Sequence, residues 1–151
     1  MMLRWLLAAA HLLALGIGLG AVWARGRALR GSLDSAGLRR VFGADTWWAV
    51  AALLWIGTGL WRLFGSTEKA TAYYMHNHVF WTKMALLGVI LALEVWPAVT
   101  LVRWRRRVAK GEPVDTRPAA RLARISVVQA ALVVLMVLAA TAMARGYGMA
   151  R

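Results

Sequence analysis

Four long apolar runs are the feature of this chain that most constrains its fold. The runs cover residues of about 3–24, 46–64, 78–102 and 124–145. Each is close to the roughly 20 residues that a helix needs to cross the hydrocarbon core of a bilayer. Short connections of the kind between these runs join antiparallel neighbours. The sequence therefore predicts an all-α, integral membrane, up-down four-helix bundle that forms one domain over residues 1–151.

The composition agrees with a membrane protein. Hydrophobic residues make up 61% of the chain, nine residues are Trp, and the mean hydropathy is +0.58. The first run is longer than the 7–15 apolar residues of a signal peptide, so we do not expect it to be cleaved. The chain has no Cys, which excludes disulfides, thiolate metal sites and covalently attached c-type haem.

The net charge of +13 is concentrated in two alternate loops, 25–45 and 103–123, which hold most of the basic residues. This is the positive-inside pattern of a protein of the bacterial cytoplasmic (inner) membrane. It places both loops in the cytoplasm, and both termini and the loop at 65–77 outside. The basic residues would then lie beside anionic lipid headgroups. The bilayer is thus the expected partner, and binding of nucleic acid is not expected.

Ionisable residues inside the runs need a partner, a wet cavity or a route to the membrane surface, because burying one costs about 2.5–3.5 kcal/mol. They are His11, Arg62, Lys83 and Glu94. Glu94 lies about 16 Å from Lys83 along a helix, so the two cannot pair directly. On the helix of the third run, His76 is expected to share the face of Lys83, and His78 to point to the opposite face. Asp45 precedes the second run and is expected to cap it.

A ligand pocket in the outer half of the bundle is the main functional prediction. His11 lies about 12 Å inside the first run, and topology brings Arg62, His76 and Lys83 to the same half. Trp48 and Trp55 share a helix face with Arg62. An imidazole for iron, aromatic walls and basic groups for propionates would suit haem b or a porphyrin, with His11 as the iron ligand.

Other interpretations of these residues remain open. Met136 could supply a second axial ligand, and the triplet His76-Asn77-His78 could bind copper or zinc if it lay in a loop. Gly16 and Gly20 form a GxxxG pair that is typical of helix packing. Lys83 and Glu94 could line a polar path in a small transporter. The tryptophans could equally be membrane-interface anchors and packing residues.

A family resemblance follows from the order of these motifs. They are a His in the first run, an Asp before the second, GLWR at 59–62, YYMHNHVFWTK at 73–83, Trp96-Pro97 and RWRRR at 103–107. In this order the chain resembles a bacterial family of predicted four-span membrane proteins of unknown function, in which Asn77, Phe80, Trp81 and Lys83 are the most specific positions. It is more distantly similar to the four-helix membrane protoporphyrinogen oxidases and to copper-resistance protein D. The distant resemblance implies haem or porphyrin binding near His11 and Lys83.

Together these observations predict a haem- or porphyrin-binding redox protein with a pocket in the outer leaflet, lined by His11, Trp55, Arg62, His76 and Lys83. A membrane redox partner would then be expected. The alternative is a non-enzymatic accessory subunit or a homo-oligomeric packing protein. The sequence does not decide whether the protein is an enzyme.

Overall fold

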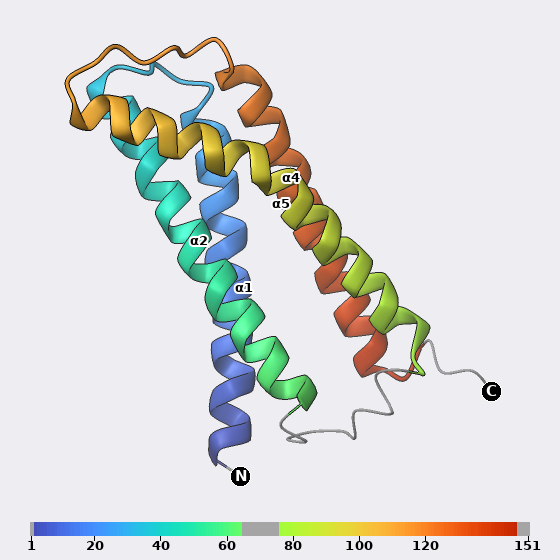
Figure 1. Cartoon of the computed structure of the whole chain (residues 1–151). Helices are drawn as coiled ribbons and strands as arrows, with labels where there is room; N and C mark the ends of the chain where they lie inside the picture. Colours follow the sequence, from blue (N-terminus) through green and yellow to red (C-terminus); the bar gives the residue numbers. More distant parts are fainter. Residues whose placement is uncertain (1, 65–75, 148–151) are drawn as a thin grey trace.

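Four long helices make up the computed structural model, which describes residues 2–64 and 76–147. They are α1 (Met2–Ala28), α2 (Ser35–Phe64), α4 (His78–Ala109) and α5 (Ala119–Ala144) (Figure 1). All four are long and apolar enough to cross a membrane. Large apolar side chains cover their outer surfaces, as at Leu53, which is 73% exposed. The all-α, four-helix membrane prediction is therefore confirmed.

The two ends of the bundle differ in character. The turns at 29–34 and 110–118 lie together at one end, here called the basic end (Figure 1). The start of α1 and the end of α5 lie at the other, here called the terminal end. The positive-inside pattern predicts that the basic end is cytoplasmic.

Helix α2 begins earlier than its apolar run. The Asp34 carboxylate accepts a hydrogen bond from the backbone N–H of Gly37 at 2.7 Å, which satisfies one of the free amides of the first turn. The segment after it continues without a break into the membrane run. Asp45 consequently lies inside the helix, and the prediction that it caps the helix is wrong.

Helix α4 changes direction along its length (Figure 1). Pro97 lies within it and is fully buried. Proline removes one backbone hydrogen bond and crowds the preceding turn, which bends a helix. The part of α4 that follows runs across the basic end, where the Arg105 guanidinium donates a hydrogen bond to the Phe42 carbonyl of α2 at 2.7 Å.

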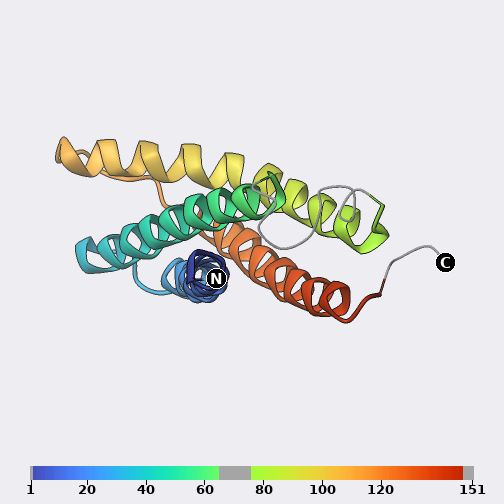
Figure 2. The same ribbon diagram turned by 90° about the horizontal axis from the view of Figure 1, so that it is seen from below.

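The helices pack in the order α2, α1, α5, α4. Helix α1 packs against α2 and α5, and α4 packs against α5. The chain thus forms two hairpins, α1–α2 and α4–α5, that meet through α1 and α5. The hairpins lie close at the basic end and diverge toward the terminal end (Figures 1 and 2).

Two apolar clusters hold the hairpins together. The basic-end core consists of Leu29, Leu38, Val41, Leu101, Trp104, Ala119, Leu122 and Ala123. The central core consists of Ala21, Val22, Trp48, Ile90, Ala130, Val133 and Met136. Met136, considered above as an axial ligand, is a buried member of the central core.

Candidate functional site

Arg25 is the largest fully buried side chain among the described residues. It lies in the last turn of α1, at the interface with the other three helices. Arg25 follows His11 and Gly18 at intervals of seven residues, so the three share one helix face. A guanidinium removed from water needs a partner for each of its five N–H groups.

Every N–H group of Arg25 has a partner. Nε donates to Ser126 Oγ at 3.0 Å, and Nη1 donates to Asp45 Oδ1 at 2.8 Å and Glu94 Oε1 at 2.7 Å. Nη2 donates to Glu94 Oε2 and Gln129 Oε1, both at 2.8 Å. The Arg25–Glu94 pair is therefore bidentate, the strongest geometry for this pair.

The partners of Arg25 also bind one another. The Gln129 amide donates to Glu94 Oε2 at 2.8 Å and to the Ile90 carbonyl at 3.2 Å. On the other side, Arg105 of α4 donates to Asp45 Oδ2 at 3.0 Å. Two carboxylates thus balance two guanidinium groups, and the cluster carries no net formal charge.

This polar network, made of Arg25, Asp45, Glu94, Arg105, Ser126 and Gln129, joins all four helices between the two apolar cores. Sequence reasoning missed Arg25 because it counts among the basic residues of loop 25–45. The seven-residue interval to His11 is the signal that could have found it. The network also supplies the partner that Glu94 requires, and that partner comes from a different helix.

His11 lies on the α1 face that meets α2. Its Nδ1 is 2.9 Å from the Thr58 hydroxyl, which also donates to the Leu54 carbonyl at 2.7 Å. The two atoms lie within hydrogen-bond distance, which orients the imidazole ring. The ring packs 5.8 Å from Trp55, and a Cβ on Gly59 would approach its Cε1 to 3.3 Å.

The other predicted pocket residues lie closer to the terminal end. Arg62 is in the last turn of α2, near enough to Lys83 for their charges to interact. His76 precedes α4 and is exposed. Helix α4 begins at His78, so the helical phase that predicted an alignment of His76 with Lys83 does not extend to His76. The structure brings His11 and Trp55 together, with their ring centroids 5.8 Å apart. Much of the loop at 65–77 lies outside the described residues.

Asn77 is the buried member of the His76-Asn77-His78 triplet. Its Oδ1 accepts from the backbone N–H groups of Val79 at 2.9 Å and Phe80 at 3.3 Å, which caps α4. Its Nδ2 donates to the Tyr147 carbonyl at 3.3 Å. The flanking histidines are both exposed. In the described ranges 2–64 and 76–147, no three metal-binding side chains of the His, Cys, Asp or Glu type form a cluster.

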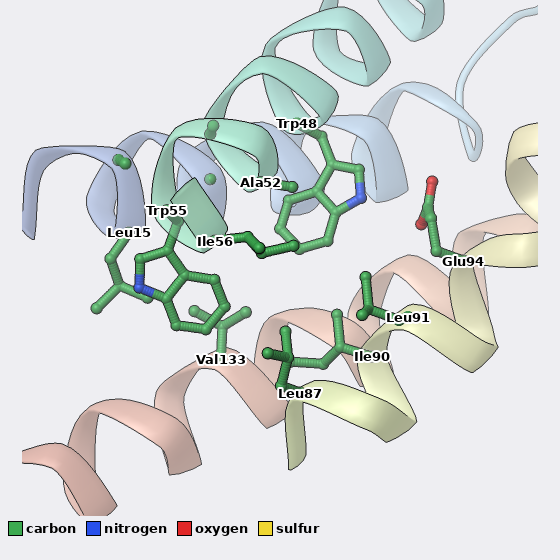
Figure 3. A pocket seen from close by; sticks show the side chains of 13 residues that line it. Leu15, Trp48, Ala52, Trp55, Ile56, Leu87, Ile90, Leu91, Glu94 and Val133 are labelled. Carbon is green, nitrogen blue, oxygen red and sulfur yellow. The ribbon is translucent and has the colours of Figure 1, made fainter. Parts of the chain in front are cut away.

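A narrow apolar cleft separates the hairpins on the terminal-end side of the polar network (Figure 3). Trp48, Ala52, Trp55 and Ile56 of α2 face Leu87, Ile90, Leu91 and Glu94 of α4 across it, and α1 and α5 close its back with Leu15 and Val133. Glu94 is the charged residue of the lining. The indole Nε1 of Trp55 is buried, and it has no hydrogen-bond partner within the part of the chain that the structure describes.

The cleft can be compared with the predicted tetrapyrrole pocket. Its free volume is about 40 Å³, whereas clefts for drug-sized ligands measure roughly 300–1,000 Å³. A haem or porphyrin does not fit this cleft as it stands, and of the predicted pocket residues only Trp55 lines it. His11 does have the arrangement of a metal-binding histidine, because its Nδ1 is oriented by an oxygen.

The fold and these sites define an integral membrane protein with four spanning helices, a buried polar network and an apolar cleft between α2 and α4. The chain belongs to the family described as predicted membrane protein (DUF2214), whose model matches residues 3–148. That description assigns no activity. Comparison with curated proteins and with solved structures gave no match, so the more distant resemblance to protoporphyrinogen oxidases and copper-resistance protein D has no support there.

Proposed function

We propose that this protein binds a lipid-soluble ligand in the cleft between α2 and α4. The observation that carries the proposal is the buried Trp55 Nε1, a hydrogen-bond donor without a partner in the described chain, at the edge of an apolar cleft. Leaving such a donor unpaired costs about 1–3 kcal/mol. A ligand oxygen would offset that cost. The proposed ligand is therefore a narrow apolar molecule that carries a carbonyl group, such as an alkyl quinone or a lipid ester.

The packing of the helices gives this ligand an entry route. Helices α2 and α4 are not among the closely packed pairs, and the hairpins diverge toward the terminal end (Figures 1 and 2). The polar network fixes their other end. A ligand larger than the free volume of the cleft would enter from the lipid as the hairpins move apart at the terminal end. The basic end would stay joined.

Ligand capture tests this proposal. The protein is purified in mild detergent, its organic extract is analysed by mass spectrometry, and an alkyl benzoquinone is titrated while tryptophan fluorescence is recorded. Ala52→Phe fills the cleft, and Trp55→Phe keeps the wall but removes the N–H donor. Ala49→Phe, on the exposed face of the same helix, is the matched control.

We expect Ala52→Phe to abolish saturable quenching by the quinone. Trp55→Phe should weaken binding about tenfold, which corresponds to one hydrogen bond of roughly 1.4 kcal/mol. Ala49→Phe should bind as the unmodified protein does. Equal binding by Ala52→Phe and Ala49→Phe would contradict a site in the cleft.

Binding of haem b or a porphyrin stays a second prediction, favoured by the oriented imidazole of His11. It requires the hairpins to lie farther apart than they do here. A Soret band in the freshly purified protein, lost in His11→Ala and kept in the exposed-site control His78→Ala, would support it. A colourless protein that does not bind added haemin would contradict it. A redox role would follow only from such a cofactor.

An accessory or homo-oligomeric role is the remaining prediction. Gly16 and Gly20 are exposed, and a Cβ built on either meets no atom within 4 Å. Packing within the described chain therefore does not explain this GxxxG pair. Glu94 is bound to Arg25 and does not continue a polar path from Lys83, which offers no support for a transporter.

A further inference from the structure

A second concave surface lies on the α1–α2 hairpin, and it is separate from the cleft. It is a groove of about 870 Å³ lined by Ile17, Gly20, Ala21, Trp23, Ala24, Arg27, Ala28, Gly31, Arg40, Ala44 and Trp47. Most of its α1 lining recurs every three or four residues, which places it on one helix face. Small side chains form its floor, and Trp23 and Trp47 are both more than half exposed at its sides.

The groove has the length of one bilayer leaflet. From Arg27 to Ile17 along α1 is about 15 Å, at 1.5 Å per residue. Half of the roughly 30 Å hydrocarbon core is the same distance. The lower part of the groove is apolar, and its upper part reaches the basic end. An acyl chain fits the lower part, and a headgroup would lie at the upper part.

Two arginines at the upper part of the groove are without ion-pair partners in the described residues. Arg27 lies in the last turn of α1 and Arg40 near the start of α2, and both are exposed and line the groove. In contrast, Arg25 and Arg105 are paired with carboxylates. Two unpaired guanidinium groups above an apolar groove are complementary to an anionic headgroup above an acyl chain.

We propose that this groove binds an anionic phospholipid of the leaflet at the basic end. The headgroup phosphate would lie between Arg27 and Arg40, and one acyl chain would lie over Gly20 between Trp23 and Trp47. A second copy of this chain is the competing occupant. Charge complementarity favours the lipid, since two copies related by a two-fold axis would bring the arginines of both toward the same interface.

Native mass spectrometry of the full chain tests this site. The protein is equilibrated with equal amounts of phosphatidylglycerol and phosphatidylcholine, and the bound lipids are counted by mass. The double variant Arg27→Gln/Arg40→Gln removes the headgroup contacts. The double variant Arg103→Gln/Arg106→Gln, at exposed positions of the same end outside the groove, is its control.

We expect one tightly retained phosphatidylglycerol. The preference of the protein for phosphatidylglycerol over phosphatidylcholine should fall roughly thirtyfold in the Arg27/Arg40 variant. Each basic residue near the headgroup contributes about 1 kcal/mol, and the variant removes two. It should fall much less in the Arg103/Arg106 variant. An equal loss in both variants would show only a general attraction to positive charge and would overturn the proposal.

Filling the groove provides a second readout that does not depend on charge. Gly20→Leu places a side chain where a Cβ meets no atom within 4 Å, so the fold should tolerate it while the lipid is displaced. Gly57→Leu, at an equally open and exposed position of α2, should keep the lipid.

Because the chain has no cysteine, Gly20→Cys can also test whether a second copy of the chain occupies the groove. A disulfide-linked dimer on oxidation in liposomes would show that the groove is an interface between copies.

Discussion

At the scale of single residues, the polar network is the most constrained part of the molecule. Arg25 is fully buried, and its five hydrogen bonds reach three other helices. The sequence predicts that Glu94 cannot pair with Lys83 and must be satisfied by a different helix, by water or by reaching the membrane surface. It does not identify that partner, because the positive-inside pattern assigns Arg25 to the loop. Only the helical phase that Arg25 shares with His11 distinguishes it from its basic neighbours.

Replacing Arg25 should destabilise the fold more than replacing any other basic residue of the basic end. Arg25→Met leaves Glu94 without its ion-pair partner, and removing one member of a buried pair costs about 3–5 kcal/mol. Unfolding in a detergent titration, followed by tryptophan fluorescence, measures the change. Arg103→Met, at an exposed position, should change the free energy of unfolding by less than about 0.5 kcal/mol.

The coupling of Arg25 to Glu94 can be measured with a double-mutant cycle. The combined variant Arg25→Met/Glu94→Gln should lose less stability than the sum of the two single changes. Strict additivity would mean that the two side chains act independently, and the network would then not be one unit.

At the scale of elements, the sequence predicts the four spans but not that α2 runs unbroken from Ser35 to Phe64. Helix α2 begins at Ser35 because Asp34 caps it and because Leu38 and Val41 pack into the basic-end core. A hydropathy run does not detect an amphipathic helix start among arginines. The presence of Pro97 predicts that α4 bends but does not predict the direction of the bend.

Asn77 should matter more to stability than the histidines beside it. Asn77→Ala removes the cap of α4 and the hydrogen bond to Tyr147, and loss of a cap alone costs about 0.5–2 kcal/mol. His76→Ala and His78→Ala change exposed side chains and should have little effect. The apparent melting temperatures of the three variants test this order. A larger loss in either histidine variant would instead indicate a role for the imidazoles in the fold.

At the scale of the whole molecule, the order α2, α1, α5, α4 cannot be derived from the apolar runs. Their side chains are apolar on every face, so they carry little information about which face meets which helix. The few polar residues specify the arrangement, because each must reach a particular partner. The result is two hairpins that are joined at the basic end and separate at the other.

The orientation of this molecule in the membrane is a separate prediction. With no native cysteine, Glu112→Cys at the basic end and Tyr147→Cys at the terminal end, both at exposed positions, can each be labelled alone. In intact bacterial cells, an impermeant thiol reagent should label the cysteine at 147 and leave that at 112 unlabelled until the membrane is broken. The reverse labelling would contradict the positive-inside assignment.

The central claim is that the hairpins are fixed at the basic end and can part at the terminal end. Electron-paramagnetic-resonance distances between spin labels test it most directly, with one pair at Leu60→Cys and Thr82→Cys and the other at Gly43→Cys and Arg106→Cys. All four positions are exposed, and each pair joins α2 to α4. We predict that an alkyl benzoquinone shifts the 60–82 distance and leaves the 43–106 distance unchanged. An unchanged 60–82 distance at saturating quinone, or an equal shift in both pairs, would contradict the account.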